Sequence, residues 1–73
     1  MADEKLAYMA NQIGRFFKSQ KADTAVDAIH DHLTKFWDRR MRQAIVAQLA
    51  EDATKLDPLV RQAVDRLSNT PTQ

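Results

Sequence analysis

Helix-breaking residues are almost absent from this chain of 73 residues, and their scarcity constrains the fold more than any other feature. Glycine occurs once, at Gly14, and the two prolines, Pro58 and Pro71, lie late in the chain. Because glycine and proline disfavour helix interiors most strongly, this composition favours helices from end to end. The sequence therefore predicts an all-α fold, a small bundle of three to four helices.

Apolar residues recur with helical spacing in two stretches that each end in a pair of aromatic residues. We predict a first helix over residues 3–19 and a second over 24–37, with Asp23 as the N-cap of the second. Their short connection favours antiparallel packing, which makes them a central helical hairpin. The predicted apolar stripes are Leu6, Met9, Ala10, Ile13, Phe16 and Phe17, followed by Ala25, Val26, Ile29, Leu33, Phe36 and Trp37.

The four aromatic residues at the ends of these stripes are expected to anchor the core. Burying one large aromatic side chain removes about 150–250 Å² from water, which is worth roughly 4–6 kcal/mol as an upper estimate. Each pair is predicted to pack near the beginning of the other helix and so to close the hairpin at both ends. These structural anchors are Phe16, Phe17, Phe36 and Trp37.

Two positions on the first helix lie outside this scheme. Gly14 lies beside the apolar stripe, where it either permits a close helix crossing or is a tolerated weak point in the helix. Tyr8 points away from the stripe, so it is either an ordinary exposed residue or part of an interface with a partner.

A cluster of three arginines directly follows the second aromatic pair. Asp38 is a candidate N-cap for a third helix over 39–53, and the arginines crowd its first turn. The helix dipole disfavours each cation there by roughly 0.3–1 kcal/mol. Either this is a solvated basic turn, or an acidic partner surface compensates the cost, with Arg40 and Arg42 facing its carboxylates. The residues predicted to bind a partner are Arg39, Arg40, Met41, Arg42 and Tyr8.

The remaining part of the chain predicts two further features of the bundle. Apolar residues of the third helix spread over about 180°, which is wider than one neighbouring helix covers, so we expect it to contact two neighbours. Asp57 and Pro58 form a helix start signal for a fourth helix. We predict a single helical domain over residues 1–67 and a frayed tail over 68–73.

Residue types that carry catalysis or bind metals do not form a recognisable site. The chain has no cysteine, and it has no glycine-rich phosphate loop or Ser/His/Asp arrangement with visible context. His30 and His32 are about 200° apart on a helix, so they cannot bind one metal ion together. The sequence predicts neither an enzyme by itself nor a cofactor or metal site, and leaves the histidines at the edges of the apolar stripe.

Charge and hydropathy restrict the partners of the chain. Eleven basic and ten acidic residues give a net charge of +1, which is too balanced for a dedicated nucleic-acid-binding or membrane-surface protein. The acidic N-terminus and the absence of a run of about 18 apolar residues predict a cytoplasmic protein. A chain of this size is marginally stable alone, and without disulfides a protein partner is the support to expect.

Two blocks of residues resemble the delta subunit of NAD-dependent formate dehydrogenase. They are Met-Ala-Asn-Gln-Ile-Gly-Arg-Phe-Phe at 9–17 and Phe-Trp-Asp-Arg-Arg-Met-Arg at 36–42, the second preceded by His32 and Leu33. The resemblance extends from about Leu6 to Leu67. Arg39 departs from the family pattern, which usually has proline after the aspartate, and this slightly weakens the preorganisation of the third helix.

The resemblance implies a non-catalytic accessory subunit of a soluble molybdenum- or tungsten-dependent formate dehydrogenase complex. In such complexes other subunits carry the metal-pterin cofactor, the iron-sulfur clusters, FMN and the NAD site. It also implies the catalytic (alpha) subunit as first partner, and a role in assembling or stabilising that subunit after cofactor loading. The alternative is a free-standing helical regulatory or nucleic-acid-binding module that uses the basic turn from Arg39 to Arg42.

Overall fold

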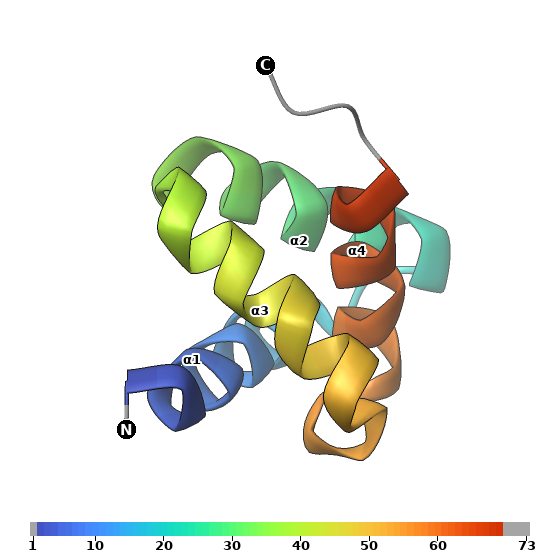
Figure 1. Cartoon of the computed structure of the whole chain (residues 1–73). Coiled ribbons are helices and arrows are strands. Elements are labelled where there is room, and N and C mark those ends of the chain that lie inside the picture. The colour runs from blue at the N-terminus through green and yellow to red at the C-terminus, as the bar shows by residue number, and fades with distance from the viewer. Residues whose placement is uncertain (1, 70–73) are drawn as a thin grey trace.

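A computed structural model describes residues 2–69, with the side chains of residues 5–69, and it confirms the all-α prediction. The elements are α1 (Ala2–Phe17), α2 (Ala22–Phe36), α3 (Arg39–Glu51), the short 3-10 helix η1 (Ala53–Lys55) and α4 (Pro58–Asn69) (Figure 1). Every α-helix boundary lies within two residues of its predicted position. The first two residues of the predicted tail are helical, and 70–73 lie outside the described residues.

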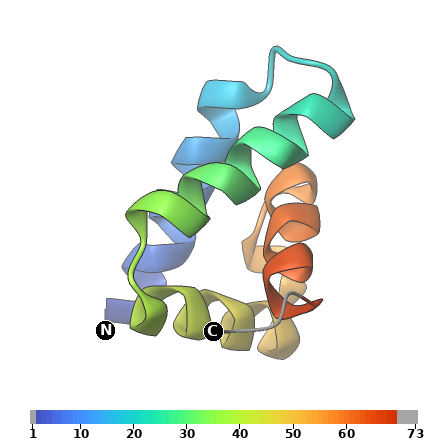
Figure 2. The ribbon, with the colours of Figure 1, turned by 90° about the horizontal axis from the view of Figure 1, so that it is seen from above.

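The helices surround the core from different sides. In Figure 2, α1 lies on the left and α4 on the right, α2 runs diagonally across them, and α3 runs along the end where α2 finishes. The third helix contacts both α1 and α4, which confirms the prediction of two neighbours. The predicted central hairpin of α1 and α2 is not confirmed, because α2 makes its most extensive contacts with α4.

The core consists mainly of aliphatic side chains rather than aromatic pairs. Trp37 is 5% exposed and Phe17 packs partly against the core, as predicted for anchors. The prediction is wrong for Phe16 and Phe36, which are 79% and 72% exposed. The largest fully buried side chains are Ile29, Leu33, Ile45, Leu56, Val60 and Val64.

The contact between Gly14 and α4 explains why Phe16 is outside the core. A Cβ atom at Gly14 would lie well under 3.0 Å from Cγ2 of Val60, so only glycine allows this close approach of the two helices. The buried face of α1 is therefore rotated by about 50° from the predicted stripe, at 100° per residue. This rotation carries Met9 and Phe16 to the surface. The close crossing is the alternative that the structure supports for Gly14.

Asn11 fixes the position of the loop that precedes α4. Its amide nitrogen donates a hydrogen bond to the carbonyl oxygen of Lys55 at 2.9 Å, and its Oδ1 accepts one from the backbone nitrogen of Asp57 at 2.9 Å. Between these two residues Leu56 is buried. Because the two bonds satisfy backbone groups beside a buried side chain, they hold α4 in register with α1.

The helix starts differ in how well their caps were predicted. Asp38 is confirmed as the N-cap of α3, since its Oδ1 accepts a hydrogen bond from the backbone nitrogen of Met41 at 2.8 Å. Asp23 is not the N-cap of α2. That helix begins at Ala22, so Asp23 lies in the first turn and accepts a bond from the adjacent Thr24 nitrogen.

The close crossing predicts a measurable cost for a single methyl group. We expect Gly14→Ala to lower the free energy of unfolding by about 1–3 kcal/mol, because overpacking against Val60 outweighs the gain of up to about 1 kcal/mol in helix propensity. Urea denaturation followed by circular dichroism measures this change. Combining Gly14→Ala with Val60→Ala should cost less than the sum of the single changes. A Gly14→Ala protein as stable as the parent would contradict the close-crossing explanation.

Candidate functional site

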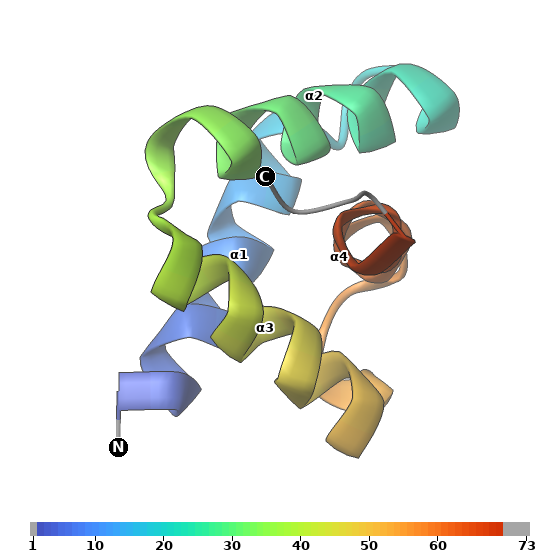
Figure 3. The ribbon, with the colours of Figure 1, turned by 45° about the horizontal axis from the view of Figure 1, so that its top comes forward.

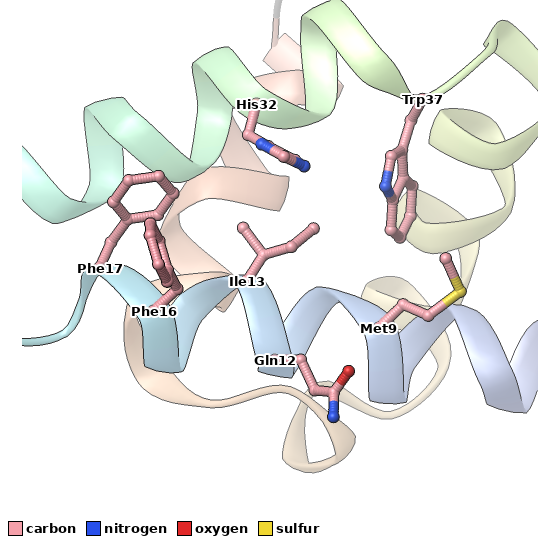
Figure 4. A pocket seen from close by; sticks show the side chains of 7 residues that line it. All are labelled: Met9, Gln12, Ile13, Phe16, Phe17, His32 and Trp37. Carbon is pink, nitrogen blue, oxygen red and sulfur yellow. The ribbon is translucent and has the colours of Figure 1, made fainter.

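A groove between α1 and α2 is lined mostly by apolar and aromatic side chains. Figure 4 shows Met9 and Trp37 at one end, Phe16 and Phe17 at the other, and Ile13 between them. The groove has a volume of about 380 Å³. We call it the docking groove, and the residues that line it are Met9, Gln12, Ile13, Phe16, Phe17, His32 and Trp37.

Exposed aromatic side chains extend the docking groove onto both rims. The rings of Phe16 and Phe17 meet edge to face with centroids 5.0 Å apart, and the ring of Phe36 packs on His32 with centroids 4.7 Å apart. Tyr8, which is 61% exposed, accepts a hydrogen bond from Gln12 on the α1 rim. Contiguous exposed apolar patches are uncommon on monomeric proteins and mark interaction sites.

The backbone explains why neighbouring aromatic residues at the end of α2 point in different directions. The helix ends at Phe36, and Trp37 has extended dihedral angles of φ −94° and ψ 135°. The change of backbone direction turns Trp37 into the core while Phe36 stays on the helix surface, one turn after His32. No helix in the described chain covers Phe36, although it lies on the same stripe as the buried Leu33.

Arg42 has a role inside the chain that differs from the predicted contact with a partner. Its Nη1 donates hydrogen bonds to the carbonyl oxygens of Thr34 at 3.1 Å and Trp37 at 2.5 Å. These carbonyls belong to the end of α2, where the helix dipole favours a cation. The unfavourable interaction of the Arg42 charge with the dipole of α3 is thus offset by a favourable interaction with the dipole of α2.

The other residues predicted to bind a partner remain available to one. Arg39 and Arg40 are exposed and follow Trp37 closely in the chain, so they lie near one end of the docking groove. Met41 is half-buried and packs against the core. Binding of a partner by these residues and by Tyr8 stays a prediction.

The two histidines lie on opposite edges of α2. His32 lines the docking groove, whereas Nε2 of His30 is buried and has no hydrogen-bond partner among residues 2–69. Burial of the ring, together with the nearby positive charge of Arg66, holds the pKa of His30 below its ordinary value of 6.5. The carboxylates of Asp27 and Asp31 oppose this shift; Asp27 is paired with Arg66, and Asp31 with Lys35.

Residues that could hold a metal or cofactor are not brought together in the described part of the chain. Within it, no three His, Cys, Asp or Glu side chains form a group that could bind a metal ion. The full sequence contains no cysteine to ligate an iron-sulfur cluster. No helix within residues 2–69 is long and apolar enough to cross a bilayer.

The apolar stripe predicted from the sequence places Met9 and Phe16 in the core, so it does not reveal the docking groove. A signal for the true buried face is present in the small residues Ala7, Ala10 and Gly14. Their spacing of three and four residues places them on one side of α1. Small side chains in such a row favour close helix packing. When this side of α1 packs against a neighbouring helix, the larger side chains Met9 and Phe16 point outward.

Comparison with known families identifies most of the chain. The family model described as NADH-dependant formate dehydrogenase delta subunit FdsD matches residues 5–64. The matched segment contains the docking groove, the Asp38 cap and the three arginines, and it confirms the resemblance drawn from the two sequence blocks. No curated protein and no solved structure matches the chain significantly.

The contrast between Arg42 and Arg40 predicts different effects for the same substitution. Arg42→Met keeps most of the apolar stem but removes the guanidinium, so we expect a loss of about 1.5–3 kcal/mol in the free energy of unfolding. Arg40→Met is the matched control, and as a surface change it should stay within about 0.5 kcal/mol of the parent. Urea denaturation compares the two. Equal stabilities would show that the bonds to the end of α2 contribute little.

The environment of His30 predicts a pH dependence of stability. A lowered pKa in the folded state means that the unfolded chain binds more protons below the ordinary pKa of 6.5. Stability should therefore fall as the pH decreases from about 7 to about 5. The midpoints of urea denaturation at these two pH values test this. The His30→Gln variant should lose most of the pH dependence, whereas the control His32→Gln should keep it. A pH dependence that persists in His30→Gln would show that other groups cause it.

Proposed function

This chain belongs to the NADH-dependent formate dehydrogenase delta subunit family, and we propose that it acts as a non-catalytic accessory subunit of that complex. Its role in this proposal is to assist assembly or to stabilise the cofactor-loaded catalytic (alpha) subunit. The proposal takes the complex to be soluble and cytoplasmic, with other subunits carrying the molybdenum or tungsten pterin, the iron-sulfur clusters, FMN and the NAD site.

The observation that carries this proposal is the exposed aromatic surface of the docking groove. Phe16 and Phe36 are 79% and 72% exposed, although both belong to apolar helical stripes. Covering most of one such ring removes roughly 150 Å² from water, which is worth about 4 kcal/mol at about 25 cal/mol per Å². Two rings together offset the lower end of the estimated cost of association, about 4–15 kcal/mol.

The chemistry of the docking groove supports binding rather than catalysis. Its polar lining consists of an amide, Gln12, and an imidazole, His32, among five apolar or aromatic side chains. Neither a carboxylate pair nor a nucleophile with an adjacent base lines it. A surface of this composition suits a protein partner, whose side chains can fill the space between the helices.

If the chain binds only the folded form of its partner, mass action stabilises that folded form. At about one hundred times the dissociation constant, such binding stabilises the folded partner by about 2.7 kcal/mol. The effect is reciprocal, so this small subunit also gains stability from the partner. Its action changes how much intact enzyme exists and leaves the chemical step to the other subunits.

The nucleic-acid-binding alternative is weakened by the orientation of Arg42. Its hydrogen bonds to the carbonyls of Thr34 and Trp37 leave two arginines of the predicted basic turn, Arg39 and Arg40, for contacts with phosphates. Nucleic-acid binding by a basic patch depends on several such contacts and falls steeply with salt. We therefore keep the accessory-subunit role as the proposed function.

Removal of this chain from its complex tests the proposal. We expect a lower yield, metal occupancy or lifetime of the complex, with nearly unchanged turnover in the surviving loaded enzyme. The measurement is formate-dependent NAD reduction normalised to bound molybdenum or tungsten, with and without this subunit. A large decrease in normalised turnover, at unchanged occupancy and stability, would show a direct effect on the active site or electron path and would refute the proposal.

A further inference from the structure

We infer that the docking groove receives an amphipathic helix of a partner subunit with acidic residues near the end that lies beside Trp37. This inference rests on the proposed function, because it names the kind of segment through which the subunit would be held. Three properties of the described residues support it: the spacing of the groove side chains, the state of the backbone around them, and the distribution of charge.

The spacing of the groove side chains matches the surface of a third helix. On α1, Met9, Ile13 and Phe16 line the groove at intervals of four and three residues. They span about 10 Å along the helix axis, which corresponds to about two turns of a partner helix. Apolar anchors at positions i, i+3 or i+4, and i+7 of that helix would lie in the same groove.

The backbone of the groove favours a helix over an extended peptide. Both walls are helices, α1 and α2, whose backbone hydrogen bonds are formed within each helix. A peptide that binds as an added strand needs a sheet edge, and the described chain contains no strand. The groove therefore offers side-chain packing as its main interaction, which suits the apolar face of a helix.

Charge around the groove selects an acidic partner. Residues 1–42 contain eight basic and six acidic side chains, whereas residues 43–73 contain three basic and four acidic ones. Arg39 and Arg40 are exposed after Trp37 at one end of the groove, whereas Lys18 lines a different pocket between α1 and α4. Carboxylates near this end of the bound helix would complement the two arginines.

Three acidic side chains of the same segment have partners within the chain. Asp27 pairs with Arg66, Asp31 pairs with Lys35, and Asp38 caps α3. They therefore neutralise little of the positive charge of Arg39 and Arg40. A second copy of this chain would bring together two segments that each carry a net charge of +2, so like-charge repulsion disfavours self-association through this face.

Site-specific crosslinking in the assembled complex identifies the occupant of the groove. Phe16 is replaced by the photoreactive residue p-benzoylphenylalanine, a change that its 79% exposure should tolerate. After irradiation of the intact complex, mass spectrometry maps the crosslinked peptide. We expect one segment with apolar residues at helical spacing and carboxylates near one end. A second copy of this chain, a segment without acidic residues, or no crosslink in the intact complex would overturn the inference.

Binding measurements with exposed-site variants give an independent test. The double variant Phe16→Ser and Phe36→Ser should bind the rest of the complex, purified without this subunit, with a dissociation constant at least tenfold higher than that of the parent. Its helical content should be unchanged. The matched control, Ala47→Ser with Gln62→Ser, alters exposed positions on α3 and α4 and should bind like the parent. Arg39→Glu with Arg40→Glu should weaken binding at low salt more than at high salt.

The two proposals fail in different ways. Groove variants that bind like the parent, while the parent subunit still raises metal occupancy of the complex, would overturn the helix inference and leave the proposed function intact. Loss of metal-normalised turnover on deletion of the subunit would overturn the proposed function, whatever segment occupies the groove.

Discussion

The close contact of Gly14 with Val60 determines how the first helix lies on the rest of the molecule. Because a Cβ atom at Gly14 would overlap Cγ2 of Val60, this position needs the smallest residue. The contact places the narrow side of α1 against α4, and Asn11 holds the adjacent loop to the same helix. The large side chains Met9 and Phe16 are consequently turned to the surface, where they form one wall of the docking groove.

The opposite wall depends on the corner between α2 and α3. Trp37 leaves the helical path and enters the core, and Arg42 binds carbonyls at the end of α2. Together with the Asp38 cap, these interactions determine where one helix ends and the next begins. Figure 3 shows this corner of the chain between α2 and α3. Phe36, the last residue of α2, stays exposed on the rim. The interactions that close the core therefore also shape the candidate binding surface.

This arrangement gives the aromatic residues two different environments. Buried aliphatic side chains and Trp37 stabilise the fold, whereas Phe16 and Phe36 are exposed and, in the proposed function, provide area for association. A chain of this size cannot bury every apolar residue, because a small domain has a high ratio of surface to volume. Apolar surface that remains outside costs little stability in the isolated chain and becomes favourable when a partner covers it.

The sequence by itself determined the local features of this protein. Helical periodicity and the scarcity of breakers predicted four α-helices within two residues of their observed bounds, and the Asp38 cap and the Pro58 helix start followed from local hydrogen bonding and backbone geometry. Only the tertiary structure decided that Phe16 and Phe36 are exposed and that Arg42 binds the end of α2. Periodicity specifies which side chains share a helix face, but burial depends on which part of that face a neighbouring helix can approach.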